Sequence, residues 1–188
     1  MKPVLVTFLL LTQCLLSLAQ SVAEIKKLNA IDTNQIELIE KKKLHNLIRS
    51  TKSPYTLVAI YTNMCGGTKY LLNYVNKAHE KYSDSLQILL CSSMPYGSKN
   101  EMIKVLQKYS VNLSPVYIIN SELYKDDPDD DRMKGYRFRH SICKPCRKDI
   151  IGVPYYILFN QKGKVVYGGY PTRINFDSLV NAYLTRRQ

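Results

Sequence analysis

The sequence predicts an α/β domain built on a central mixed β-sheet with helices on its faces. Short apolar runs rich in Val, Ile, Leu and Tyr alternate along the chain with segments whose apolar residues recur at helical spacing. Near the end, two strand-like runs are separated by Gln161-Lys162-Gly163, a turn that is typical of a hairpin. The alternation predicts parallel strands at the centre of the sheet, and the hairpin predicts an antiparallel edge.

The first half of the domain contains three predicted strands and two predicted helices. Residues 35–40 (QIELIE) alternate between polar and apolar side chains, which predicts a short strand, and apolar positions 44, 47 and 48 predict a helix that ends before Pro54. The run 55–62 (YTLVAIYT) is almost continuously apolar, which is typical of a strand buried on both faces. Apolar positions 71, 75, 78 and 82 mark one face of a helix, and 86–91 (LQILLC) predicts another buried strand.

The second half continues the pattern and ends in the hairpin. Apolar positions 102, 105, 106 and 109 predict a helix, and 115–120 (PVYIIN) predicts a strand. The hairpin strands are expected at 154–160 and 164–167. Apolar positions 176, 179, 180, 183 and 184 predict a last helix, with Asn175 as its N-cap.

The segment 121–151 interrupts this alternation and is expected to be an insertion before the hairpin. It contains an acidic run at 126–131, a basic run at 132–139 and the pair Cys143 and Cys146. The acidic run lacks the glycine and the closing glutamate of an EF-hand calcium loop, which favours a solvated acidic turn. The basic run is interpreted as the salt-bridging neighbour of that turn.

Residues 1–19 are expected to be a secretory signal peptide rather than part of the fold. A basic start precedes an apolar stretch that is too short for a membrane span, and Ser17-Leu18-Ala19 places small residues at a cleavage site. Gln13 before Cys14 is too large for the usual lipoprotein site, which argues against a lipid anchor. We therefore expect export to the periplasm or the cell exterior, and no transmembrane segment in the mature chain.

The chain of 188 residues carries a net charge of +12, from 27 Lys and Arg residues against 15 Asp and Glu residues. Such a charge favours acidic partners or anionic surfaces. No nucleic-acid-binding motif accompanies it, so nucleic acid is not an expected partner. After the signal peptide and a polar lead-in at 20–34, a single folded domain is expected to span 35–188.

Cys65 follows the second predicted strand and directly precedes a predicted helix. Backbone N–H groups and the helix dipole stabilise a thiolate relative to a thiol at such a position. Gly66 and Gly67 permit close approach of another chain, Thr68 offers a hydroxyl to the sulfur, and Lys69 adds positive charge. Cys65 is therefore predicted to be a nucleophilic thiol, and the alternative is a structural cysteine that closes a turn.

The strand–cysteine–helix element, the later Gly152-Val153-Pro154 and the final hairpin together resemble the thioredoxin fold, and within it the secreted TlpA-like thiol–disulfide oxidoreductases. The resemblance covers residues 35–188. It implies that the bond before Pro154 is cis, that Pro154 lies against the active-site Cys65, and that Val153 offers backbone groups to a substrate strand. It also implies protein thiols or disulfides as partners, and no cofactor.

The sequence departs from that family at the site itself. Met64 stands where the family carries Trp, and Thr68 stands where it carries a second Cys. Ala59 stands where thioredoxin carries a buried carboxylate that helps to deprotonate the second Cys. A dithiol cycle therefore cannot run at this site alone, and Cys65 would act through a mixed disulfide that another thiol resolves.

Three other cysteines are candidates for the resolving thiol. Cys91 ends a predicted strand on the active-site side of the sheet, although a small core residue is the simpler interpretation. Cys143 and Cys146 form a C-x-x-C with a central Pro, and the alternatives of a redox pair and a structural disulfide remain open. A metal site is not expected, because this pair and His140 supply only three ligands.

Three functions are considered from the sequence. The first is an exported thiol–disulfide oxidoreductase in which Cys65 attacks. The second is a redox-inactive binding module that holds partners at Val153 and Pro154, which the missing second Cys supports. The third, a peroxidase, fits least, because Thr68 follows Cys65 whereas peroxidatic sites of the superfamily place Thr before the Cys.

Overall fold

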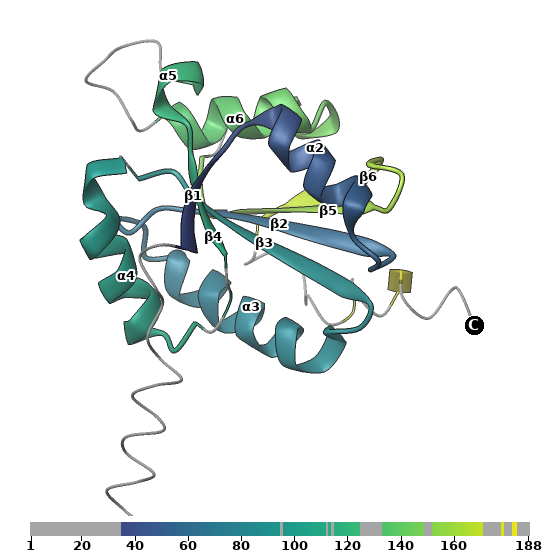
Figure 1. Cartoon of the computed structure of the whole chain (residues 1–188), viewed down its shortest axis with the longest axis horizontal. Helices are drawn as coiled ribbons and strands as arrows, with labels where there is room; N and C mark the ends of the chain where they lie inside the picture. Colours follow the sequence, from purple (N-terminus) through teal and green to yellow (C-terminus); the bar gives the residue numbers. More distant parts are fainter. Residues whose placement is uncertain are drawn as a thin grey trace, which may run out of the picture.

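The computed structural model describes residues 35–94, 96–111, 113, 115–124, 133–148, 152–170, 178, 182 and 183. Within them the chain forms a six-stranded sheet with helices on both faces (Figure 1). This confirms the predicted α/β architecture. In spatial order the strands are β1 (Ile36–Ile39), β4 (Val116–Ile119), β3 (Leu86–Ser92), β2 (Tyr55–Tyr61), β5 (Tyr155–Asn160) and β6 (Val165–Gly169).

The sheet is mixed, as the sequence predicts. β1 pairs in parallel with β4, β4 with β3, and β3 with β2, whereas β5 runs antiparallel to both β2 and β6. The turn between β5 and β6 contains Gly163 at φ +77°, a backbone conformation that glycine adopts without a steric penalty. The antiparallel edge is therefore the predicted hairpin.

Helices cover the sheet in two layers. In Figure 1, α3 and α4 lie on one side of the sheet, and α2 and α6 lie on the other. The two core clusters agree with this view, because one contains buried residues of α3 and α4 and the other contains those of α2 and α6. The helices are α2 (Lys41–Ser50), α3 (Thr68–Tyr82), α4 (Lys99–Lys108), α5 (Ser121–Tyr124) and α6 (Lys134–Ile142), with short 3-10 turns at Tyr96–Ser98 and Pro145–Lys148.

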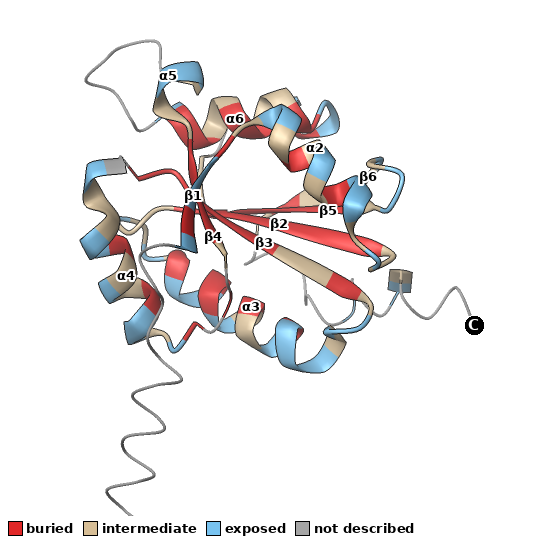
Figure 2. Ribbon diagram, in the orientation of Figure 1, coloured by how far each residue is buried: buried red, intermediate tan, exposed pale blue. Residues whose placement is uncertain are grey.

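β2 lies at the centre of the core. All seven of its residues are buried (Figure 2). Neighbouring side chains of a strand point to opposite faces of the sheet. Leu57 and Ala59 belong to the core cluster under α3, whereas Val58 and Ile60 belong to the cluster under α6. This two-sided burial explains why the sequence of β2 is continuously apolar.

The described part of the basic run forms a helix that the sequence did not predict. Residues 134–142 form α6, and Lys134 and Arg139 are fully buried in it. The acidic run with which the basic run was expected to pair lies outside the described residues. Phe138 and Ile142 on the same helix join the core cluster beneath it. The segment expected to be an insertion therefore supplies part of the second helical layer.

Several sequence predictions lie outside the described residues. These are the signal peptide and lead-in, the acidic run 126–131 and most of the last predicted helix, of which Ser178, Ala182 and Tyr183 are described and helical. No helix in the described part of the chain is long and apolar enough to cross a membrane.

Candidate functional site

Cys65 lies in the loop that joins the carboxyl end of β2 to the start of α3. Its N–H lies 3.5 Å from the carbonyl of Thr62, and its own carbonyl accepts a hydrogen bond from the N–H of Thr68 at 3.0 Å. Its thiol is free of any disulfide, and the residue is partly exposed. A tight turn at the head of a helix thus presents one sulfur at the surface.

Pro154 lies beside this turn, although it comes 89 positions after Cys65 in the sequence. The peptide bond between Val153 and Pro154 is cis, as the resemblance implies. Gly67 is the contact point, because a Cβ added to it would lie 2.9 Å from Cγ of Pro154 and 3.6 Å from Sγ of Cys65. Only glycine therefore permits the proline ring and the cysteine turn to pack this closely.

Thr68 does not act as the sequence suggested. Its hydroxyl donates to the carbonyl of Thr62 at 2.6 Å, so it is engaged by the backbone instead of the Cys65 sulfur. The side chain is only 2% exposed. Thr68 therefore closes the turn between β2 and α3, and the position where the family carries a second thiol holds a buried hydroxyl.

Apolar side chains are exposed on either side of Cys65. Met64 is 90% exposed and Tyr70, in the first turn of α3, is 56% exposed, whereas most large apolar side chains described here are buried. Exposed Met and Tyr side chains are common where a protein contacts a partner. Lys69, expected to add positive charge, is also exposed on this turn.

Cys91 lies inside the core. It is 0% exposed, pairs with Ile60 of β2 in the sheet and belongs to the cluster under α6. Burial raises the pKa of the Cys91 thiol well above its ordinary value, which keeps it protonated and unreactive at neutral pH. The structure thus places it as a small core residue, the simpler of the two interpretations that the sequence left open.

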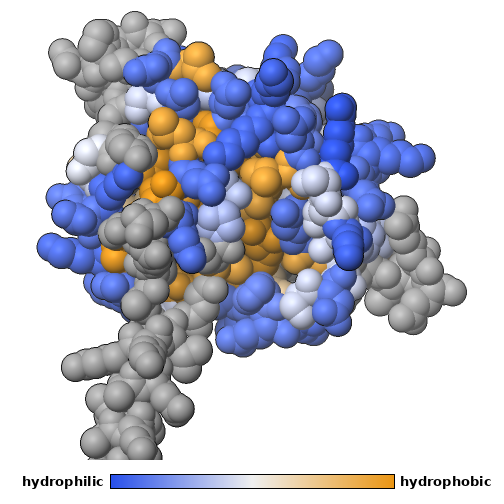
Figure 3. Space-filling model, in the orientation of Figure 1, coloured by the Kyte–Doolittle hydropathy of each residue, from blue (hydrophilic) through white to orange (hydrophobic). Residues whose placement is uncertain are grey.

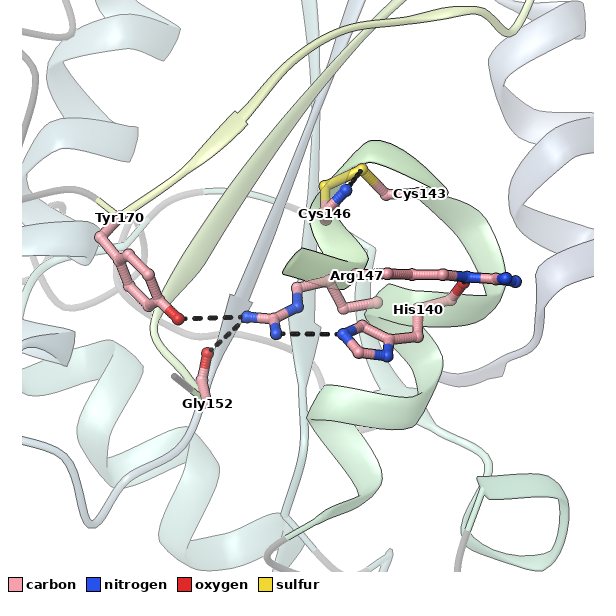
Figure 4. Close-up of a disulfide and its surroundings, with 7 residues drawn as sticks. His140, Cys143, Cys146, Arg147, Gly152 and Tyr170 are labelled. Carbon is pink, nitrogen blue, oxygen red and sulfur yellow. Dashed lines mark hydrogen bonds between the residues drawn. A yellow bond between two sulfur atoms is a disulfide. The ribbon is translucent and has the colours of Figure 1, made fainter. Parts of the chain in front are cut away.

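Cys143 and Cys146 form a disulfide just after the end of α6 (Figure 4). Both are buried in the cluster under α6, on the opposite face of the sheet from α3. The bond packs on β6, because a Cβ added to Gly168 would lie within 3.5 Å of both sulfurs. The structure therefore does not bring this pair together with Cys65, and its burial fits a structural disulfide.

α6 contacts the site at two points that the sequence did not reveal. A Cβ added to Gly135 would lie 2.9 Å from a methyl of Val153 and 3.1 Å from Cβ of Ser93. The helix therefore packs closely on the loop before Pro154 and on the loop that follows β3. Lys134 donates to the carbonyl of Met94 at 2.8 Å and to Ser121 Oγ at 2.9 Å. The spacing of Gly135, Phe138 and Ile142 is helical and was the available signal, but the charged residues between them masked it.

One hollow in the described structure lies away from this site. It measures about 650 Å³ and lies at the opposite end of β3 from the cysteine loop, between α2 and α3. Within β3, only Leu90–Ser92 pair with β4, so the first residues of β3 have no neighbouring strand on that side and lie at the bottom of the hollow. Figure 3 shows apolar surface in the middle of this view, bordered by polar residues. No cysteine lines this hollow, so we assign it no part in the chemistry.

The described residues contain no cluster of three or more His, Cys, Asp or Glu side chains arranged like metal ligands. Cys65 and cis-Pro154 lie together at one end of the sheet with Gly67 between them, and their neighbours in the chain are Val153 and the exposed Met64.

Comparison with known proteins agrees with this fold. No protein-family model and no curated protein matches the chain. Among solved structures, a thiol-disulfide isomerase from Corynebacterium glutamicum matches with a TM-score of 0.52 and 13% identity, over 74% of this chain and 84% of that one. A thioredoxin-like protein in its oxidised form matches with a TM-score of 0.50 and 17% identity, over 73% of this chain and 82% of that one. The chain therefore has a thioredoxin-like fold.

Proposed function

We propose that this chain is a thiol–disulfide exchange protein that acts through one cysteine, Cys65. The observation that carries the proposal is the packing of Cys65, Gly67 and cis-Pro154 in one partly exposed turn, with a buried Thr68 in place of a second thiol. A protein disulfide is the proposed substrate, because the exposed Met64 offers a contact for an apolar side chain of a polypeptide.

The reaction consists of two exchanges. The Cys65 thiolate attacks one sulfur of the partner disulfide, a new S–S bond forms to Cys65, and the other partner sulfur leaves as a thiolate that takes up a proton. A low-molecular-weight thiol then attacks the partner's sulfur in the mixed disulfide and restores the Cys65 thiolate. These two exchanges leave one free partner thiol and one mixed disulfide between the partner and the small thiol, so the number of S–S bonds is unchanged. A second molecule of the small thiol attacks the small thiol's own sulfur in that bond, frees the second partner thiol and leaves as the small-molecule disulfide. The two electrons that reduce the partner disulfide therefore come from two molecules of the small thiol.

Reduction of a protein disulfide tests this proposal. Insulin is incubated with a low-molecular-weight thiol, with and without the reduced chain, and the released B chain is followed by turbidity. We expect the chain to accelerate the reaction and the rate to rise with the thiol concentration, because an external thiol must resolve each mixed disulfide. An acceleration that needs no external thiol beyond the first turnover would contradict the single-cysteine scheme.

Alkylation of the native protein reports the difference between the two free thiols. With iodoacetamide at mildly acidic pH, we expect Cys65 to be modified first and Cys91 to stay unmodified until the protein is denatured. The reason is that Cys91 is 0% exposed and burial raises the pKa of its thiol. Peptide mapping by mass spectrometry measures both. Faster labelling of Cys91 in the native state would show that the nucleophile is misassigned.

Thr68→Cys is expected to convert the site to a two-thiol cycle. The position begins α3, and its N–H bonds the carbonyl of Cys65 at 3.0 Å, so two sulfurs would face each other across one turn. The mixed disulfide of this variant should then decay without added thiol, with release of the partner's thiol. Thr68→Ser, which keeps the hydroxyl that bonds Thr62, is the matched control and should retain the adduct. Equal adduct lifetimes in the two variants would argue against this geometry.

A redox-inactive binding module is the second candidate. The engagement of Thr68 with the Thr62 carbonyl favours it, because this position is built to close a turn and carries no thiol. Such a module would bind reduced and oxidised partners equally and would not accelerate insulin reduction. The same assay therefore separates the two functions.

We also propose export of the mature chain, supported by the residues at positions 1–19 that read as a signal peptide. Fractionation of cells that express the whole chain tests this. The expected product starts at Gln20 and is found outside the cytoplasm, whereas an uncleaved chain in the cytoplasm would refute it.

A further inference from the structure

We propose that Arg139 is a positioning residue of the thiol site, which fixes the loop 152–154 so that an extended partner chain can bind along it opposite Cys65. This inference rests on the proposed function and deepens it, because it assigns to a buried residue of α6 the placing of the loop at which the resemblance implies that a substrate strand binds. Arg139 itself touches no reacting atom in this account.

Arg139 is fully buried, which is unusual for a guanidinium, and its contacts lead directly to the loop. Its Nη1 donates to the carbonyl of Gly152 at 3.1 Å and lies 3.3 Å from the hydroxyl of Tyr170. Its Nη2 lies 3.4 Å from Nε2 of His140. The guanidinium thus connects α6 to Gly152, the residue just before the cis Val153–Pro154 pair.

Two aromatic rings fix the guanidinium in place. Its central carbon lies 4.4 Å from the ring centre of Tyr155 and 4.9 Å from that of Tyr136. Cation–π contacts of this kind strengthen when they are withdrawn from water. Because the group is planar and its donors point along fixed directions, these contacts set the direction of the bond to Gly152. A lysine ammonium at the same place would keep the positive charge but would lose the planar group whose N–H donors point in fixed directions.

The loop that Arg139 fixes has backbone groups available to a partner. The pairing between β2 and β5 ends at Tyr155, so Gly152 and Val153 lie beyond the sheet ladder. Within the described part of the chain, the backbone of Val153 makes no hydrogen bond. Its side chain packs on Gly135 of α6, which leaves the main chain as the group that an incoming strand can pair with. Arg139 and Gly135 therefore brace two successive residues of the loop from one helix.

The test compares two disulfides that carry the same leaving group. One is dipyridyl disulfide, and the other is an extended peptide whose single Cys is joined to thiopyridine. Both report attack by Cys65 as released thiopyridone, but only the peptide has a main chain to pair with the loop. We expect the wild-type protein to react faster with the peptide.

Arg139→Met is expected to lower the rate with the peptide by about tenfold or more and to leave the rate with dipyridyl disulfide within about twofold, since a hydrogen bond to a charged group contributes ~1.5–3 kcal/mol. The rate of Arg139→Lys with the peptide should lie between the rates of the wild-type protein and Arg139→Met. If Arg139→Met does not fold, Arg139→Lys is compared with the wild-type protein at a lower temperature instead. Arg137→Met is the matched control, because Arg137 lies on the same helix and donates to the Tyr124 carbonyl, away from the loop.

The outcomes separate this inference from the proposed function. Loss of rate with the peptide alone supports the positioning role, whereas an equal loss with both disulfides shows a merely structural role and overturns it. Unchanged rates in a folded variant overturn it as well. A wild-type protein with no preference for the peptide refutes recognition by the loop, and a wild-type protein that reacts with neither disulfide refutes the proposed function itself.

Discussion

Cys65→Ser is expected to reduce the acceleration of insulin reduction to the uncatalysed rate. A serine hydroxyl cannot form the S–S bond on which the exchange depends, and the other thiols cannot replace it. Cys91 is 0% exposed, and Cys143 and Cys146 are joined to each other on the far face of the sheet. The measurement is the turbidity rate at a fixed concentration of the small thiol.

Cys91→Ala is the matched control for this loss. It removes the other free thiol and should keep the full rate, with a small loss of stability from the buried sulfur. Residual activity in Cys65→Ser that disappears only when Cys91 is also replaced would show that the buried thiol reacts. That result would make the thiol of β3 the nucleophile and would refute the assignment of Cys65.

Phe138→Ala is expected to lower the free energy of unfolding by about 3–5 kcal/mol, the usual range for an aromatic side chain removed from a core. Phe138 is 0% exposed and its ring makes an edge contact with Tyr124, with centres 5.3 Å apart. The change would leave a cavity between α6 and the sheet that neighbouring side chains can fill only in part. Urea denaturation followed by circular dichroism measures it.

Leu123→Ala provides the comparison, because Leu123 is 55% exposed on the neighbouring α5. It should change stability by no more than about 0.5 kcal/mol. If Phe138→Ala were as mild as Leu123→Ala, α6 would not be part of the core. The account of how Gly135 and Arg139 brace the proline loop would then fail as well.

The sheet was predictable because its strands have sequences that buried strands require. β2 and β5 are almost continuously apolar because both of their faces are covered. The turn before β6 has a positive φ of +77° at Gly163, a backbone conformation for which glycine is the usual residue. α6 was not predictable in the same way. Lys134 and Arg139 are charged residues at buried positions of this helix. Their partners are a backbone carbonyl and an aromatic ring elsewhere in the chain, and the spacing of apolar residues gives no sign of these contacts.

The site divides along the same line. Cys65 was predictable because a cysteine before a helix is a local pattern. The place of Pro154 beside it was implied only by the resemblance, and the structure brings the two together through Gly67. The burial of Cys143 and Cys146 on the face of the sheet opposite α3 was not predictable. Which face of the sheet receives them depends on how the chain crosses from β4 to β5, and no local pattern near the C-x-x-C encodes that crossing.

The central claim is that one thiol, Cys65, carries the exchange, and mapping the covalent adduct tests it most directly. The wild-type protein is incubated with a peptide disulfide, quenched in acid and digested without reduction for mass spectrometry. We predict one adduct per chain, on the peptide that contains Cys65, with Cys91 unmodified, the Cys143–Cys146 bond intact and the adduct removed by a small thiol. No adduct on Cys65, or an adduct on Cys143 or Cys146, would contradict the account.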